Sequence, residues 1–545
     1  MAMAQATSDF PVPSDLEGFW QWDKMHGPRP LTPMSQEMTF MPGIDGFTNA
    51  MHEFGAPVGF SARFVNYYGY MAVAPLDIGD ETMEARLKRY GDALKRDVPR
   101  VGINWETQWL PSILPGLEKA RSLDYGALSD TALLDTLEEL RADFLHRMTV
   151  HGRINFVTIS ASWFADFYNE HFQPENPTEP YEALQGFLTR SVDAGRGLWR
   201  LSRAIKASSV LQTAFNEVEV SELEAALETS DEGRAFLKQF RSYLDEFGWR
   251  SEAFELADPT WREHPFVPLN LLQGYMRVSD DEDPDVLYQR AVETREGLLA
   301  RARDRLASDS EKLARFNELY EAARYYLPVT EDHNFYIDQV GSTVLRLPIL
   351  ELGRRLVRAG AAEQEDDVFL LFLSEIRDGL KGKDQRSPIA QRRAEMDRWG
   401  KVVPPPALGE PPEPTGDPFE EAMIKMFGLP PEPSRDPDLI TGIGASPGIV
   451  QGRAKVVRRL DEASKLQPGD IMVCEMTMPP WTPLFATVSG LVADTGGVLS
   501  HCAIVAREYH LPCVVGTAVG TNVITDGMLL TVDGSKGIVR IDSRS

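Results

Sequence analysis

The sequence predicts a multidomain protein with a mainly α-helical part followed by a smaller C-terminal α/β domain. Apolar residues recur at three- and four-residue spacing over long stretches between residues 83 and 400, as amphipathic helices require. Residues 441–545 instead combine short apolar runs with glycine turns, which is typical of alternating strands and helices. Between these parts, residues 401–440 hold 11 of the 38 prolines. We therefore expect one domain at 1–400, a linker at 401–440 and a second domain at 441–545.

Residues 1 to about 80 are rich in aromatic side chains and are interrupted by proline, glycine and asparagine. These aromatic residues either form ordinary core or provide an apolar wall for a flat organic substrate. Helical periodicity follows in five stretches: 84–96, 130–151, 181–207, 220–247 and 285–326. The periodicity predicts helices and says nothing about chemistry.

A polar stripe marks the helix expected at 331–347. Its residues recur every four positions among apolar neighbours: Asn334, Asp338, Ser342 and Arg346. The stripe either forms a buried hydrogen-bonded chain from Asp338 to Arg346 through Ser342, or lines a site. Pro348 should end or kink this helix, because proline lacks a backbone donor and clashes with the preceding turn.

The proline-rich segment at 401–440 should behave as a semi-rigid tether, because such a composition cannot form a packed core. A short apolar piece at 419–427 indicates a docking helix within it. The tether is either a passive linker or the means by which the C-terminal domain swings between two sites.

The most informative stretch is 491–517. Leu491 to Ala493 reads as a buried strand, Thr495-Gly496-Gly497 as a tight turn, 500–509 as a short helix and 511–515 as the next strand. His501 therefore lies beside a glycine turn in the first turn of a helix, where backbone N–H groups and the positive helix end favour an anion. The histidine either caps its own helix or carries a phosphoryl group, because neutral imidazole is nucleophilic near neutral pH.

This stretch resembles the phosphohistidine domain of the PEP-utilising enzymes. The matching residues are Thr495-Gly496-Gly497, Ser500-His501, Ala503-Ile504, Ala506-Arg507 and Leu511-Pro512. The resemblance extends over 441–545 and implies a swivelling domain that carries a phosphoryl group on His501, attached to the ring nitrogen remote from the backbone. It also implies that the phosphate is bound by Thr495, Gly496, Gly497, Ser500 and Arg507.

Two phrases in the helical part, 247–252 and 330–338, resemble the substrate domain of rifampin phosphotransferases and phenylphosphate synthases. The first phrase departs from its relatives at Trp249, where histidine is common. His333 and Asp332 are the best candidates for deprotonating an acceptor hydroxyl, because a histidine oriented by a carboxylate suits general-base work. Weaker substrate-side candidates are Asp338, Arg346, Arg250 and His151.

Charge and cysteine content limit the partners and the compartment. The formal net charge of −26 repels nucleic acid and anionic lipid, and neither a membrane span nor a signal peptide is recognisable. The three cysteines, Cys474, Cys502 and Cys513, lack metal-ligand spacing and fit a reducing cytoplasm. We expect a cytoplasmic protein without a metal site of its own.

No glycine-rich nucleotide loop is recognisable in residues 1–440. The chain therefore reads as half of a split enzyme, and the family resemblance implies that a separate ATP-grasp subunit, with ATP and Mg²⁺, phosphorylates His501. ATP would then yield AMP and inorganic phosphate, and residues 1–400 would present the acceptor. The aromatic content and the phrase at 330–338 favour a phenol or alkylphenol as that acceptor.

Three alternatives remain open. The chain is a component of an antibiotic phosphotransferase of the rifampicin type, a phosphocarrier whose helical part docks another protein, or a regulatory relative that has lost transfer.

Overall fold

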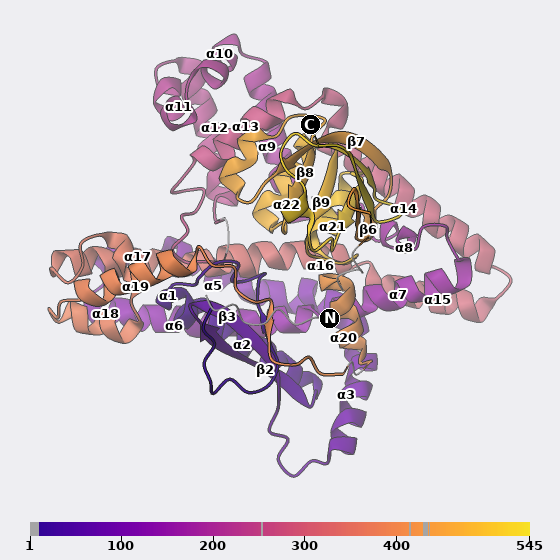
Figure 1. Ribbon diagram of the computed structural model, residues 1–545, viewed down its shortest axis with the longest axis horizontal. Coiled ribbons are helices and arrows are strands. Elements are labelled where there is room, and N and C mark those ends of the chain that lie inside the picture. Colours follow the sequence, from indigo (N-terminus) through magenta and orange to yellow (C-terminus); the bar gives the residue numbers. More distant parts are fainter. Residues whose placement is uncertain (1–9, 252–253, 414–415, 429–433, 435, 545) are drawn as a thin grey trace.

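The computed structural model describes residues 10–544 apart from 252–253, 414–415, 429–433 and 435, and it is mostly helical with a C-terminal α/β sheet region. Figure 1 shows long helices in the lower half of the view and the C-terminal sheet above them, with the small N-terminal sheet at the centre below. Among the described residues, no helix has the length and apolar character needed to cross a membrane.

The N-terminal residues form an antiparallel sheet with the strand order β2-β3-β1-β4. Its strands are β1 (Trp20–Trp22), β2 (Val58–Val65), β3 (Tyr68–Pro75) and β4 (Ala407–Leu408). Aromatic side chains fill the core beneath it, and their hydroxyl groups donate to backbone carbonyls: Tyr68 to Trp399 and Tyr70 to Pro405. Tyr68 and Tyr70 are therefore part of the hydrophobic core, which is the first of the two roles considered for the N-terminal aromatic residues.

Helices dominate the residues between these strands. The α-helices are α1 (Pro33–Ser35), α2 (Met41–Phe54), α3 (Met83–Asp97), α4 (Val101–Asn104), α5 (Leu110–Ser122), α6 (Asp130–Ile154), α7 (Val157–Phe172), α8 (Glu179–Glu182), α9 (Arg190–Lys206), α10 (Ser209–Glu217), α11 (Val220–Leu227), α12 (Asp231–Phe247), α13 (Phe266–Arg277), α14 (Pro284–Leu306), α15 (Ser310–Ala323), α16 (Tyr326–His333), α17 (Gly341–Arg358), α18 (Leu373–Leu380) and α19 (Arg386–Trp399). Short 3₁₀ or π segments are η1 (Gln36–Phe40), η2 (Val98–Arg100), η3 (Trp105–Trp109), η4 (Tyr125–Ala127), η5 (Asp280–Glu282), η6 (Asn334–Val340) and η7 (Glu365–Leu370).

Three of the five expected helical stretches are divided in the structure. A new helix begins after Thr189, Ser230 and Asp309, whose side chains accept hydrogen bonds from backbone N–H groups of the following turn. Such side chains stabilise helix starts, and apolar periodicity alone does not reveal them. The stretches at 84–96 and 130–151 correspond to the single helices α3 and α6.

The segment 326–358 is helical throughout, as α16, the π-helical η6 and α17. Pro348, the residue expected to end or kink the helix, lies buried inside α17, so it does not end it. The hydrogen-bonded chain along the polar stripe is also absent. Ser342 donates to the backbone carbonyl of Asp338, and Arg346 pairs with Glu263 at 3.0 Å.

The C-terminal residues form a sheet with the strand order β5-β12-β11-β7-β8-β9-β10-β6, in which β7 to β10 are parallel neighbours. The strands are β5 (Leu439–Thr441), β6 (Ile443–Ser446), β7 (Ile449–Val456), β8 (Ile471–Cys474), β9 (Gly490–Ala493), β10 (Cys513–Val515), β11 (Leu529–Asp533) and β12 (Ile538–Ser543). The helical elements are α21 (His501–Glu508), α22 (Gly520–Val523), η8 (Leu460–Lys465) and η9 (Pro479–Thr487).

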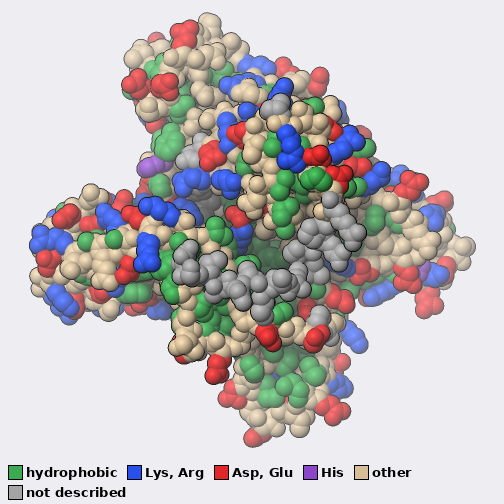
Figure 2. Space-filling view, in the orientation of Figure 1, with side chains coloured by type: hydrophobic (Ala, Val, Ile, Leu, Met, Phe, Trp, Pro, Cys, Tyr) green, Lys and Arg blue, Asp and Glu red, His purple; other side chains and the backbone are tan. Residues whose placement is uncertain are grey.

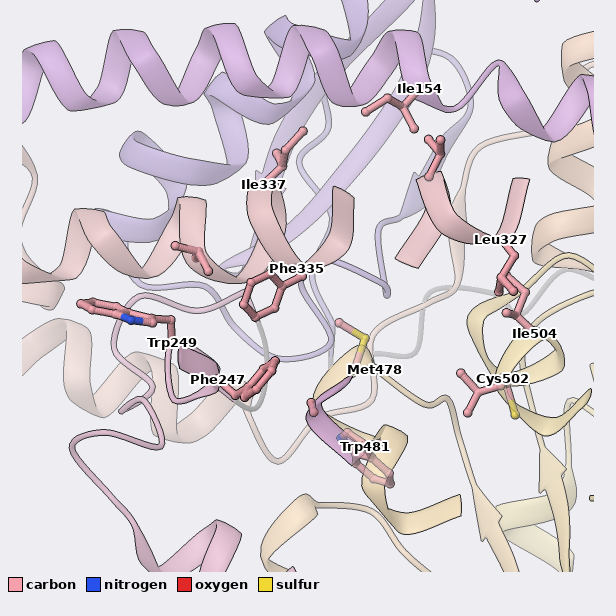
Figure 3. Close-up of a cluster of buried hydrophobic side chains, with 14 of the residues drawn as sticks. Ile154, Phe247, Trp249, Leu327, Phe335, Ile337, Met478, Trp481, Cys502 and Ile504 are labelled. Atoms are coloured by element: carbon pink, nitrogen blue, oxygen red, sulfur yellow. The ribbon is translucent and has the colours of Figure 1, made fainter. Parts of the chain in front are cut away.

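The helical part and the C-terminal part share one apolar core. Leu327 and Phe335 of the helical part belong to the same buried cluster as Met478, Trp481 and Ile504 of the C-terminal part (Figure 3). Burial of each such side chain contributes about 1.5–3 kcal/mol relative to leaving it exposed. In this conformation the C-terminal part is therefore docked on α16 and its neighbours.

The described residues of the proline-rich segment contact both parts of the molecule. Ala407 and Leu408 extend the N-terminal sheet as β4, and the expected docking helix is α20 (Pro418–Phe427). Phe419 packs against Phe156, and Lys425 lies 2.7 Å from Asp166 of α7. The segment is thus held along much of its length in this conformation.

Candidate functional site

The expected strand, glycine turn and helix around His501 are all present. β9 leads into the turn, and α21 begins at His501. The helix starts there because Ser500 has extended backbone and its hydroxyl accepts a hydrogen bond from the N–H of Ala503. His501 is the first residue of α21, and its side chain extends from the C-terminal part to Glu331 of α16.

The His501 ring contacts one residue at each nitrogen. Nδ1 lies 3.1 Å from Oε1 of Glu331 on α16, and Nε2 lies 3.3 Å from the hydroxyl of Thr482 on η9. A carboxylate only accepts hydrogen bonds, so the Glu331 contact assigns the proton to Nδ1. Nε2, the nitrogen remote from the backbone, then carries the lone pair and is the nucleophilic atom.

Glu331 is the functional residue that sequence reasoning missed. Its side chain is 2% exposed, and burial alone would raise its pKa. The attraction of His501, together with hydrogen bonds from His501 and Ser191, outweighs that effect and lowers the pKa of the carboxyl. Glu331 is therefore ionised when it faces the imidazole, which fixes the ring orientation and would stabilise a positive charge on it.

The glycine turn is occupied by the C-terminal end of α20. The N–H groups of Gly496, Gly497 and Leu499 donate to the carbonyls of Phe427, Met426 and Lys425 at 3.1, 2.8 and 2.9 Å. The Thr495 hydroxyl donates to the carbonyl of Glu475. The N–H groups expected to bind phosphate thus bind helix carbonyls in this conformation, so α20 must move before an anion can take its place.

Arg507 does not face His501. It is 3% exposed, and its guanidinium donates to the carbonyls of Ala445 and Val498 at 2.8 and 2.9 Å. These bonds tie the loop that precedes His501 to strand β6. In this conformation Arg507 therefore supports the position of the loop and does not contact the histidine.

The second histidine, His333, belongs to a buried cluster with His151 and Asp338. Its Nε2 lies 3.8 Å from Oδ2 of Asp338, the Nδ1 of His151 lies 3.2 Å from Oδ1, and the two ring centroids are 4.3 Å apart. Burial, with the neighbouring His151, lowers the pKa of His333 to about 4. His333 is thus neutral near pH 7 and can accept a proton or a metal ion.

Asp332 lies apart from this cluster, so the expected pairing of Asp332 with His333 is wrong. Its carboxylate accepts a hydrogen bond from the backbone N–H of Arg190 at 2.8 Å. Successive helical residues point in different directions, so Asp332 faces elsewhere. η6 is π-helical, which brings residues five apart to the same side, and Asp338 therefore takes the expected place of Asp332 beside His333. Burial raises the pKa of Asp332 to about 7.

Arg250 is a buried cation whose guanidinium has no hydrogen-bond partner in the described part of the chain. Its side chain is 1% exposed, and none of its three guanidinium nitrogens has a partner among the described residues. It packs over the rings of Phe247, Trp261 and Phe335, and burial lowers its pKa to about 10. The charge of Glu331 acts on Arg250, so this buried guanidinium lies near the residue that contacts His501.

Known proteins resemble both parts of this chain. The family described as "Rifampicin phosphotransferase fourth domain" matches residues 151–331, and "PEP-utilising enzyme, mobile domain" matches residues 466–537. The chain is 32% identical to chondramide synthase cmdD of Chondromyces crocatus over 98% of its own length and 14% of that protein.

Two further relatives are named phosphotransferases. Identity is 32% with phosphotransferase YvkC of Bacillus subtilis, over 78% of this chain and 51% of the relative. It is 27% with a rifampicin phosphotransferase of Streptomyces sviceus, over 79% of this chain and 50% of the relative. The chain thus spans from about a seventh to about half of the length of these three relatives.

We predict that Gly497→Ala separates α20 from the glycine turn, because a Cβ there would lie 2.2 Å from the carbonyl oxygen of Lys425. Hydrogen exchange of the backbone amides of residues 496–499 should become roughly tenfold faster. Gly91→Ala in α3, where a Cβ meets open space, is the matched control. Unchanged exchange at the turn in Gly497→Ala would contradict the proposed role of α20.

A second prediction concerns the pH dependence of stability. Below the ordinary pKa of 3.8, Asp332 is protonated in both states, whereas between there and about pH 7 only the unfolded chain ionises. Asp332 should therefore lower the free energy of unfolding as the pH rises through this window. Asp332→Asn, whose side-chain oxygen still accepts from Arg190, removes that loss.

We expect urea unfolding to show that the free energy of unfolding of Asp332→Asn, relative to that of the wild type, increases by on the order of 1–3 kcal/mol from pH 5 to pH 7. The exposed Asp366→Asn is the control. If Asp332→Asn were destabilised equally at both pH values, Asp332 would be ionised in the folded protein over this range, and the prediction would be wrong.

Proposed function

We propose that this chain, which belongs to the PEP-utilising enzyme family, is a phosphotransferase that carries a phosphoryl group on Nε2 of His501. The C-terminal part corresponds to the family's mobile domain and delivers this group to an acceptor hydroxyl held by the helical part. The observation that carries the proposal is the contact between His501 and Glu331 across the two parts. It leaves Nε2 without a proton and with a lone pair for phosphorus, beside the Thr482 hydroxyl of its own domain.

Arg250 and Glu331 have complementary roles in this proposal. The unpaired guanidinium of Arg250 attracts the phosphoryl group as it reaches the helical part, and charge neutralisation of this kind dominates catalysis of phosphoryl transfer. The ionised Glu331 favours the positive charge that the imidazole ring holds while phosphorylated. Transfer breaks the bond between Nε2 and phosphorus and forms a bond from phosphorus to the acceptor oxygen. The ring returns to its neutral form with its proton on Nδ1, and the proton of the acceptor hydroxyl passes to the cluster of His151, His333 and Asp338.

The proposed acceptor is an aromatic hydroxyl, a phenol or alkylphenol. Aromatic rings line the helical side of the site, with Phe47 against His151 and Phe247 against Phe335. We assign the handling of the hydroxyl to the cluster of His151, His333 and Asp338. The relatives named rifampicin phosphotransferase favour a second candidate, a larger hydroxylated antibiotic.

The proposed donor is ATP, bound with Mg²⁺ on a separate ATP-grasp subunit. Family resemblance suggests that ATP yields AMP and inorganic phosphate while one phosphoryl group reaches His501. The donor site and the acceptor site then lie on different modules, so the mobile domain has to leave α16 in each cycle.

The test uses the full chain phosphorylated chemically with phosphoramidate and followed by ³¹P NMR. We expect a phosphohistidine signal that is absent in His501→Ala, and its conversion to an aryl phosphate when phenol is added. Arg250→Gln should keep the phosphohistidine but slow its transfer by about 10²- to 10³-fold. Arg234→Gln, which changes an exposed arginine, is the control and should transfer at the wild-type rate.

Each outcome separates the candidates. Conversion with rifampicin and not with phenol would support the antibiotic as acceptor, and transfer to neither would support the phosphocarrier alternative. A phosphohistidine signal that persists in His501→Ala would refute the proposal.

A further inference from the structure

Three buried side chains with metal-binding atoms converge between α6 and the helix that contains η6. His151, His333 and Asp338 each offer one ligand atom, and these atoms lie within 4.8 Å of one another. Each residue is 4–5% exposed. We propose that His151, His333 and Asp338 bind a divalent transition metal ion, with Zn²⁺ as the best-matched ion.

An unsatisfied atom supports this proposal. Nδ1 of His151 has no hydrogen-bond partner among the described residues, although it lies 3.2 Å from Oδ1 of Asp338. The ring and the carboxylate attract each other at this distance, but not in the geometry of a direct hydrogen bond. A buried polar atom without a partner costs about 1–3 kcal/mol, and a cation between the nitrogen and the oxygen would satisfy both.

The second histidine is oriented as a metal ligand. Nδ1 of His333 donates to the carbonyl of Val329 at 2.8 Å, which leaves Nε2 to face Asp338 at 3.8 Å. A metal-binding histidine usually donates its other ring nitrogen to a carbonyl or carboxylate in this way. Nε2 and Oδ2 are both acceptors in this arrangement, and a metal ion of the expected bond length, about 2 Å, fits between them.

The arrangement is compatible with one ion in size and in chemistry. Ligand atoms around a metal with bonds of about 2 Å lie a little over 3 Å apart, whereas those of this cluster lie within 4.8 Å of one another, so binding would draw the side chains together. Two imidazoles and one carboxylate suit Zn²⁺, Co²⁺ or Fe²⁺, whereas Mg²⁺ prefers oxygen ligands. Three protein ligands also leave a position free, as in catalytic zinc sites.

The position of the cluster suggests what the ion would do. His333 lies two residues from Glu331, which contacts His501, and the charges of Glu331 and His333 act on each other. An ion bound by the cluster would therefore lie near the phosphohistidine site. An ion there would hold the acceptor oxygen and lower the pKa of its hydroxyl. This role rests on the proposed phosphotransfer, whereas metal binding itself does not.

The test is metal binding by the full chain. After removal of metal with a chelator and loading with Co²⁺, we expect about one tightly held ion per chain, with visible absorption bands from nitrogen coordination. Zn²⁺ should displace it and raise the thermal midpoint of the wild type. Asp338→Asn and His333→Gln, which keep side-chain size, should each weaken Co²⁺ binding by at least about 100-fold.

Controls distinguish this site from nonspecific binding and from the phosphotransfer proposal. His146→Ala removes an exposed histidine of the same helix as His151, and His501→Ala removes the proposed phosphoryl carrier. Both variants should bind Co²⁺ as the wild type does, and circular dichroism verifies that every variant is folded. Wild-type protein without a bound Co²⁺ or Zn²⁺ ion, or unchanged binding in folded Asp338→Asn, would overturn the proposal whatever the phosphotransfer assay shows.

Discussion

The contact between Nδ1 of His501 and the carboxylate of Glu331 is the interaction on which the rest of the site depends. It joins the C-terminal part to α16, and it decides which ring nitrogen carries the proton. A buried carboxylate is stable only when it is paired, and the imidazole is the partner that Glu331 finds when the two parts dock. When the C-terminal part docks on α16, the same contact therefore places the proton on Nδ1 and leaves Nε2 nucleophilic.

Two further features stabilise the docked arrangement. The apolar cluster shared by Leu327, Phe335 and Trp481 removes hydrocarbon surface from water, and the C-terminal end of α20 uses the N–H groups of the glycine turn. Each backbone hydrogen bond contributes about 0.5–1.5 kcal/mol net. Movement of the C-terminal part away from α16 has to break both sets of contacts, and an anion at the glycine turn competes directly with α20.

The local architecture of the site could be predicted from the sequence, because it is encoded by neighbouring residues. Glycines permit the turn before His501: Gly496 has a φ of +107°, and the hydroxyl of Ser500 caps the helix that follows. The docking helix at 419–427 was predictable for the same reason, since its apolar residues and its boundaries are contiguous.

Contacts between distant segments could not be predicted in this way. Glu331 stands beside Asp332 and His333 in the same phrase, and nothing in that phrase shows which of the three faces the C-terminal part. The partners of Asp332 and Arg507 are backbone groups, which carry no residue-specific signal. The pairing of His151 with His333 and Asp338 joins residues more than 180 positions apart, so only the packing of α6 against η6 reveals it.

The central claim is that Glu331 holds the proton on Nδ1 and leaves Nε2 free to carry phosphorus. Nitrogen-15 NMR of the full chain labelled at histidine, with His501 assigned by its absence from a His501→Ala spectrum, measures this directly. The account predicts a proton on Nδ1 and a lone pair on Nε2 of His501 in the wild type, and a mixture of the two tautomers in Glu331→Ala. A wild-type ring protonated at Nε2 would contradict it.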